Sequence, residues 1–211
     1  MPPALVVPWL SREPRPADWR EAPPFALVPV ADDAPPPTAF RILAAPDALH
    51  LRIVCAATRL TCRMENDGDP LYLEDVVEVF LGPAGRDPAV YLEYEVSPRG
   101  RDLLLLVACE RDGTRSAWRP WALGPDRRPS PRVRTRGGPA VHGGRVRGWT
   151  ADIRLPWALC AGLGGRPAPG AEWRGNVFRI DHAGGAPAHA AWAALDRAAF
   201  HQPARFGRIR F

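Results

Sequence analysis

The chain has no lysine, so all 28 of its basic residues are arginine, and the formal net charge is +5. The arginines are dispersed along the sequence, and the densest run, residues 127–136, is interleaved with prolines. Surfaces that bind phosphate backbones gather their basic side chains on one face. The charge is better explained by a GC-rich coding bias than by phosphate contacts, and we expect no nucleic-acid partner.

Cysteine is also scarce, and the four cysteines show neither CxxC spacing nor pairing with histidine at zinc spacing. Cys55 and Cys109 lie in apolar runs, which predicts buried free thiols rather than disulfides. No stretch approaches the ~20 apolar residues of a membrane span, and the N-terminus lacks the charged region of a signal peptide. We therefore expect a cytoplasmic protein with no membrane partner.

Catalytic and nucleotide-binding motifs are missing as well. The sequence contains no GxSxG, no HExxH, no P-loop and no GxGxxG. These absences favour a binding domain over an enzyme, and the residues leave the question of catalysis open. What the chain does have is length for one domain, 211 residues, and enough apolar side chains, 46%, for a sizeable core.

Proline is abundant and unevenly placed, with eleven of the 26 prolines in residues 1–37. Because proline has no backbone N–H to donate, this segment is predicted to be an extended N-terminal arm that wraps a surface or pairs at a sheet edge. The domain itself is predicted to span residues 38–211.

Within residues 38–211, short runs of alternating apolar and polar residues are separated by turn residues. This pattern predicts about ten strands, and neither long amphipathic helices nor a βαβ rhythm accompany them. The expected fold is all-β: a two-sheet antiparallel β-sandwich of jelly-roll or immunoglobulin-like type, with short helical turns. Residues 111–140 are rich in arginine, proline and glycine and are predicted to form a long loop.

The chain ends on "AFHQPARFGRIRF", which is unusually apolar for a terminus. Gly207, Ile209 and Phe211 alternate with Phe206, Arg208 and Arg210, so one face of a final strand can enter the core. Pro203 interrupts the preceding segment. Phe200 and His201 are therefore expected to project from a loop at the rim of the sandwich, where binding residues tend to lie.

Four segments, in this order, resemble the family 9 carbohydrate-binding modules and their relatives with DOMON-like folds. The segments are "YLEDVVEVFLGP" (72–83), "GWTADIRLPW" (148–157), "NVFRID" (176–181) followed by Trp192, and "FHQPARFGRIRF" (200–211). Each motif is short, and it is their order that makes the resemblance specific. The family fold is a sandwich of two antiparallel sheets, which agrees with the strand pattern.

The resemblance implies a non-catalytic domain that binds a mono- or oligosaccharide and serves carbohydrate catabolism, for example as an accessory module in bacterial glycan breakdown. In the sugar-binding members, two aromatic side chains sandwich a terminal sugar ring and a glutamate accepts hydroxyl hydrogen bonds. Tyr72, Phe200 and Glu78 stand at these positions, and Glu95 stands where the family has an arginine. Asp181 and His201 are expected to be lesser polar contacts.

Alternatives remain for the carboxylates. Glu93 and Glu95 share a strand face by their spacing of two and could gather with Glu78. Three carboxylates suggest a hard cation, and some family members bind calcium, although "ENDGDP" (65–70) lacks the length of a calcium loop. The same carboxylates could also be read as the acid and nucleophile of a glycosidase.

Two further functions stay open. Some DOMON-like domains hold haem for electron transfer, for which Met64 and one of four histidines (142, 182, 189 and 201) are candidates. The other alternative is a ligand-free protein-interaction domain. Sugar-binding relatives are usually exported, in contrast to the cytoplasmic location expected from the N-terminus.

Overall fold

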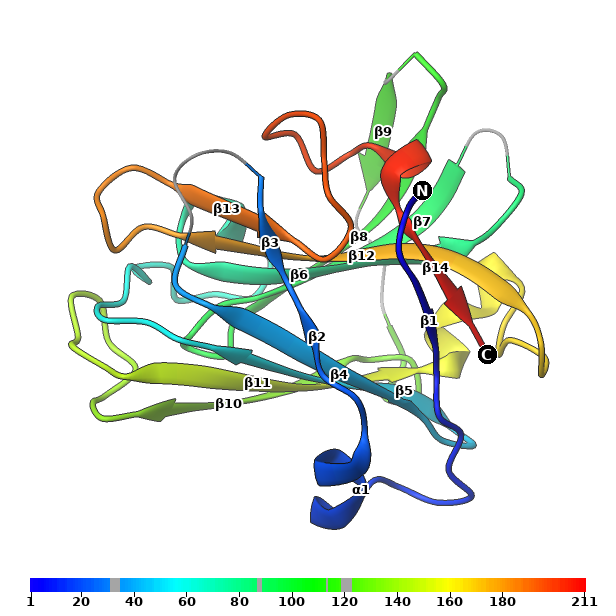
Figure 1. The fold of residues 1–211 in the computed structure, drawn as a ribbon, viewed down its shortest axis with the longest axis horizontal. Helices are drawn as coiled ribbons and strands as arrows, with labels where there is room; N and C mark the ends of the chain where they lie inside the picture. The colour runs from blue at the N-terminus through cyan, green and yellow to red at the C-terminus, as the bar shows by residue number, and fades with distance from the viewer. Residues whose placement is uncertain (31–34, 87–88, 113, 119–122) are drawn as a thin grey trace.

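The structure is a computed structural model that describes residues 1–30, 35–86, 89–112, 114–118 and 123–211. Two β-sheets pack face to face (Figure 1). Every strand pairing within them is antiparallel except that of β1 with β14. The predicted two-sheet antiparallel sandwich is confirmed.

The larger sheet has nine strands among the described residues, with the main order β1-β14-β12-β6-β7-β8-β9 and with β13 and β3 attached through β12. Its strands are β1 (Ala4–Val6), β3 (Val28–Pro29), β6 (Val76–Pro83), β7 (Ala89–Val96), β8 (Asp102–Cys109), β9 (Arg115–Trp118), β12 (Glu172–Asp181), β13 (Ala188–Ala191) and β14 (Gly207–Arg210).

Within the described ranges, the smaller sheet has five strands in the order β10-β11-β5-β4-β2. They are β2 (Phe25–Ala26), β4 (Thr38–Ala44), β5 (Ala48–Cys55), β10 (Ser130–Arg136) and β11 (Gly148–Pro156). The helical elements are short: α1 (Pro16–Glu21), η1 (Leu71–Leu73), η2 (Trp157–Leu163) and η3 (Pro203–Arg205). No helix in the described ranges is long and apolar enough to cross a membrane.

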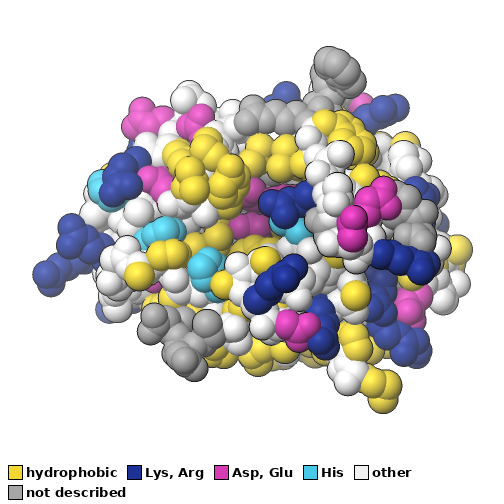
Figure 2. Space-filling view, turned by 90° about the horizontal axis from the view of Figure 1, so that it is seen from above, with side chains coloured by type: hydrophobic (Ala, Val, Ile, Leu, Met, Phe, Trp, Pro, Cys, Tyr) yellow, Lys and Arg dark blue, Asp and Glu magenta, His cyan; other side chains and the backbone are white. Residues whose placement is uncertain are grey.

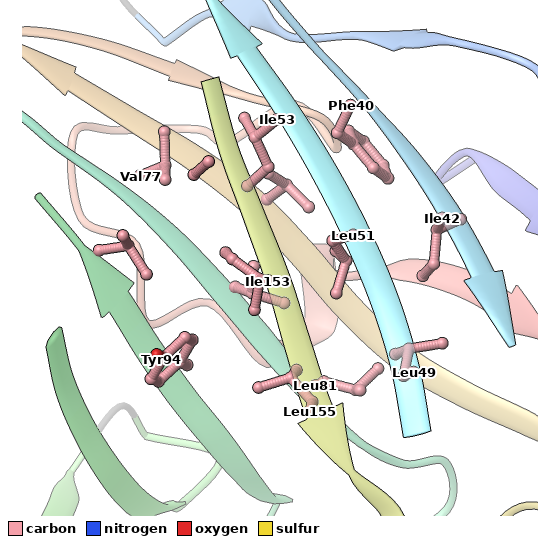
Figure 3. Packing of buried hydrophobic residues seen from close by; sticks show 14 of the residues in the cluster. Phe40, Ile42, Leu49, Leu51, Ile53, Val77, Leu81, Tyr94, Ile153 and Leu155 are labelled. Carbon is pink, nitrogen blue, oxygen red and sulfur yellow. The ribbon is translucent and has the colours of Figure 1, made fainter. Parts of the chain in front are cut away.

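The main core lies between the two sheets (Figure 3). Alternate residues of β5, such as Leu49, Leu51 and Ile53, point inward, because successive side chains of a strand face opposite sides. Val77 and Leu81 of β6 meet them from the larger sheet. The period-2 pattern in the sequence therefore identifies the inward faces correctly.

The proline-rich arm joins the edges of both sheets. β1 runs parallel to β14, β2 pairs with β4, and β3 pairs with β13. Leu5 and Val7 enter the main core, and Trp19 of α1 is buried against the outer face of the smaller sheet beside Leu43. The arm thus contributes buried side chains in addition to edge pairing, and it includes a helical turn, α1, that the proline pattern did not indicate.

The segment expected to be a long loop, residues 111–140, contains the strands β9 and β10. β10, "SPRVRTR", lies at the edge of the smaller sheet, where its arginines alternate outward and Pro131 needs no ladder donor. Arginine-rich composition concealed this alternation. Trp118 of β9 is exposed, whereas Trp121, which the sequence pairs with it, lies outside the described residues.

All four cysteines are buried and free, as the sequence predicts. Burial raises the pKa of the Cys55 thiol to about 11 and that of the Cys160 thiol to about 12. These thiols are therefore protonated at neutral pH and act as small apolar groups.

The final strand, β14, packs as expected, with Ile209 and Phe211 in the main core. Gly207 lies directly against the indole of Trp192, and a Cβ at this position would come within 2.2 Å of Trp192 Cζ3. Trp192 is itself held edge-on by Phe25 and Phe40. The glycine is thus required by the close approach of Trp192, which begins the segment leading back to residues 200–206.

We predict that Gly207→Ala lowers the free energy of unfolding by roughly 2–3 kcal/mol, because the new methyl group must displace a buried indole. Urea denaturation followed by tryptophan fluorescence measures this loss. Gly162→Ala is the matched control, since a Cβ there meets nothing within 4 Å. Equal stability of the Gly207 variant and the control would contradict the packing described.

Candidate functional site

The outer face of the larger sheet, which points away from the smaller sheet, carries a second apolar cluster. In β6, Val77, Val79 and Leu81 face the main core, whereas Val76 and Phe80 belong to this outer cluster. The segment 192–206 crosses this face and adds Phe200 and Phe206. The larger sheet is therefore covered on both faces.

A hollow of about 530 Å³ opens on this covered face. Figure 2, which looks down on it, shows acidic side chains at the bottom of a central depression, with hydrophobic side chains and histidines around them. The residues that line the hollow are Tyr72, Glu78, Glu93, Leu105, Arg115, Ala117, Ile180, His189, Ala198, Ala199, Phe200 and His201.

Three glutamates form the floor and the layer beneath it. Glu78 of β6 lies opposite Glu95 of β7 in the strand register, and Glu93 follows two residues away on the same face. Their carboxylates offer oxygens that lie within 4.8 Å of one another. All three side chains are at least nine-tenths buried, with exposed fractions of 2% for Glu78, 4% for Glu93 and 0% for Glu95.

Four oxygens of these carboxyl groups have no close hydrogen-bond partner among the described residues: Glu78 Oε1, Glu93 Oε2 and both oxygens of Glu95. The side chains of Glu93 and Glu95 interact with each other, and the backbone of Tyr72 interacts with Glu95. Unpaired polar atoms are costly inside a protein, and their cost is reduced when the group takes up a proton or a ligand. The cluster is thus the least satisfied part of this face.

Burial shifts the titration of all three acids. The pKa of Glu93 is raised to about 7, chiefly by burial. Burial and the neighbouring Glu93 raise the pKa of Glu95 to about 9, and burial with both neighbours raises the pKa of Glu78 well above its usual range. The cluster therefore retains protons at neutral pH when no cation is bound.

His201 stands between this hollow and the rest of the outer cluster. A 2.8 Å hydrogen bond joins its Nδ1 to the Tyr91 hydroxyl, and its Nε2 lies 3.8 Å from Glu93 Oε2. Burial, with a smaller effect of Arg115, lowers the pKa of His201 to about 4. The imidazole is neutral at pH 7 and so does not balance the charge of an ionised Glu93.

The two aromatic side chains expected to hold a sugar both line the hollow. Tyr72, from η1, is 47% exposed. Phe200 is buried, because one ring face stacks on Phe178 at 4.1 Å between centroids with an interplanar angle of 6°. Phe200 also makes a T-shaped contact with the ring of His189, with 5.6 Å between the ring centroids. Phe200 is therefore part of the packed wall and does not project freely from the rim.

Asp181 is the one predicted polar contact that the structure turns away from the hollow. In β12, Phe178 and Ile180 face the outer cluster, so Asp181, with the opposite parity, lies on the interior side. Its carboxylate accepts a hydrogen bond from buried Arg179 at 2.5 Å. Arg179 in turn lies over the ring of Trp149 in the other sheet. Asp181 is thus engaged between the sheets.

Of the six residues predicted for sugar contact, the structure brings Tyr72, Glu78, Phe200 and His201 to the hollow itself. Glu95 lies next to Glu78 without lining it. The sequence did not single out Arg115, which stands in the segment expected to be a loop. The sequence indicated His189 only as a candidate haem ligand. It indicated Glu93 only as a member of the acidic cluster, because a spacing of two residues places Glu93 and Glu95 on the same strand face.

Comparison with known proteins adds three structures of the same fold. No model of a known protein family matches the chain, and neither does any curated protein. A candidate carbohydrate-binding protein from Bacteroides uniformis superposes with a TM-score of 0.77 at 20% identity, covering 100% of both chains.

Two further matches are structures of a family 9 carbohydrate-binding module from Caldicellulosiruptor kristjanssonii. The complex with cellotriose has a TM-score of 0.62 at 14% identity and covers 98% of this chain and 93% of the module. The complex with glucose has a TM-score of 0.58 at 15% identity and covers 98% and 94%. This chain therefore has a fold like that of the family 9 carbohydrate-binding modules, as the sequence motifs indicated.

The raised pKa values of the glutamates predict that stability falls as pH rises. An unfolded glutamate loses its proton near pH 4.5, whereas folded Glu93 and Glu95 keep theirs to about 7 and about 9. Across this window the folded state binds more protons than the unfolded state, so raising the pH from 5 to 9 favours unfolding. Urea denaturation at a series of pH values measures the slope.

Glu95→Gln should flatten this slope, because glutamine has no proton to lose. Glu65→Gln, which alters an exposed glutamate paired with Arg99, should keep the wild-type slope. A Glu95→Gln slope equal to that of the wild type would show that Glu95 is ionised throughout.

Proposed function

We propose that this chain is a non-catalytic carbohydrate-binding domain that holds a terminal sugar ring of a mono- or oligosaccharide in the hollow on the outer face of the larger sheet. The observation that carries the proposal is the convergence of Tyr72, Glu78 and Phe200 on one hollow. Phe200 is far from Tyr72 and Glu78 in the sequence, and the three are the residues that match the aromatic and acidic contacts of the sugar-binding modules.

The chemistry of the hollow suits a sugar. Pyranose rings present C–H patches that pack on aromatic side chains, while their hydroxyls need directional partners. Tyr72 offers an exposed ring at the mouth, and Glu78 offers an unpaired oxygen at the floor. The module of the same fold from Caldicellulosiruptor kristjanssonii is seen in complex with cellotriose and with glucose, which supports the same ligand class here.

The two aromatic side chains that line the hollow, Tyr72 and Phe200, differ in how firmly the protein fixes their positions. Phe200 is fixed by its stack on Phe178 and its contact with His189, so it loses little freedom when a ligand binds. Tyr72 lies on the surface and orders on binding. With one fixed and one exposed ring, each smaller than tryptophan, the expected dissociation constant is near millimolar, about 4–6 kcal/mol of binding free energy.

We predict that Tyr72→Ala weakens sugar binding by roughly five- to ten-fold, because the exposed ring of the sandwich is lost. Isothermal titration or ligand-detected NMR against glucose, cellobiose and a panel of mono- and oligosaccharides measures the change. Leu73→Ala is the matched control, since Leu73 is an exposed neighbour that does not line the hollow. Equal loss in both variants would remove Tyr72 from the site.

Phe200 needs a gentler substitution because it is buried. Phe200→Leu keeps an apolar side chain against Phe178 and should weaken binding while the thermal midpoint stays within a few degrees of the wild type. Unchanged affinity in this variant would contradict a role for Phe200 in lining the sugar site.

The same samples test the other functions: release of sugar from a polysaccharide would indicate a glycosidase, and a Soret band would indicate haem.

A further inference from the structure

Once its carboxyl groups have lost their protons, the floor of the hollow accepts hydrogen bonds and donates none. Glu78 and Glu93 line it and Glu95 lies against them, and each of the three has an unpartnered oxygen and an exposed fraction of 4% or less. Glu78 and Glu93 are thus almost fully buried side chains that line a solvent-connected hollow, each with one unpartnered oxygen. A ligand that satisfies them must bring several donors, and a positive charge would pair with them most strongly.

The remaining lining distinguishes between two kinds of cation. A hard metal ion such as Ca²⁺ takes six to eight oxygen ligands. Beyond the carboxylates, the lining side chains are chiefly apolar, among them Leu105, Ile180 and Phe200, and only the Tyr72 hydroxyl adds a further side-chain oxygen. An ammonium group instead donates three hydrogen bonds and is attracted to aromatic faces. Three carboxylates beneath aromatic walls match an organic ammonium ion.

We propose that the hollow prefers an amino sugar, whose ammonium group is received by the Glu78, Glu93 and Glu95 cluster while its ring packs against Tyr72 and Phe200. This inference rests on the proposed function and names its ligand class. It also assigns a role to Glu95, which lies beside Glu78 and Glu93 and adds a third carboxyl group to the cluster.

Other charged and titratable groups face the cluster from each neighbouring element. They are Arg115 of β9, His189 of β13, and His201 of the segment before η3. His201 is neutral at pH 7 because burial lowers its pKa to about 4, and burial also lowers the pKa of His189. Arg115 is exposed and makes no ion pair with the glutamates within the described residues, but its charge acts on Glu93 and opposes part of the effect of burial on the pKa of that acid. The cluster is thus open to an added cation.

Protons compete with that cation. Because burial raises the pKa of Glu93 to about 7 and that of Glu95 to about 9, an arriving ammonium group displaces protons from the carboxylates. Amine binding should therefore strengthen as the pH rises from 6 to 7.5, while binding of a neutral sugar should change little.

The test compares glucosamine with glucose and N-acetylglucosamine, which share the ring and differ in the charged group. Isothermal titration at pH 7.5 and low salt should give glucosamine an affinity about ten-fold higher than that of either neutral sugar. Glu93→Gln should abolish this difference. Glu65→Gln, an exposed control, should preserve it. A thermal melt of each variant verifies that it is folded.

The outcomes separate the two proposals. If all three sugars bind equally, the amino-sugar preference is overturned and the proposed function stands. If no sugar binds but methylammonium does, the cationic site stands and sugar binding fails. If the preference for glucosamine disappears with EDTA and returns with CaCl₂, a metal ion occupies the cluster and the inference is overturned. If neither sugars nor methylammonium bind, both proposals fail.

Discussion

The larger sheet buries both of its faces, and the arrangement of the site depends on this constraint. One face packs on the smaller sheet, and the other lies under the segment 192–206. Asn176 of β12 holds the start of that segment, since its side chain donates to the Ala193 carbonyl and accepts from the Ala193 amide. Gly207 fixes the end by admitting the Trp192 indole. Between these two points the chain carries Phe200 and His201 above the glutamates.

A face covered in this way should be apolar throughout, and the three glutamates depart from that rule. Stability alone gives no reason to bury acids without partners, because apolar side chains of similar size would pack there at lower cost. Departures of this kind are concentrated at functional sites in natural proteins. The buried pair between the sheets, Arg179 with Asp181, is different because opposite charges meet there, although Arg179 Nε and Nη1 have no hydrogen-bond partner within the described part of the chain.

Much of this architecture could be predicted from the sequence, because strand periodicity reports which residues share a face. It identified the inward side of β14 and the shared face of Glu93 and Glu95 correctly. Periodicity could not predict the direction of the Asp181 side chain. It shows which residues of β12 share a face, but not which of the two faces is turned toward the other sheet. The burial of Phe200 depends on Phe178, a contact between separate segments that no local pattern records.

The edge strands β9 and β10 were hidden for a related reason: on an edge, arginine and proline are tolerated, so composition resembles that of a loop. Arg115 was missed with them. The residues that define the fold can thus be predicted from local alternation. The site depends instead on which residues of distant strands lie opposite each other and on the segment 192–206 that covers the sheet.

The most direct test of the account is a map of ligand contacts in solution. In ¹⁵N-labelled protein titrated with a sugar that binds, the largest amide shift changes should fall on residues 71–74, 189 and 198–201, which surround the hollow. A second depression on the smaller sheet, lined by Glu13, Trp19 and Arg52, provides the contrast. Shift changes confined to that second depression, with residues 198–201 unmoved, would contradict the placement of the sugar on the larger sheet.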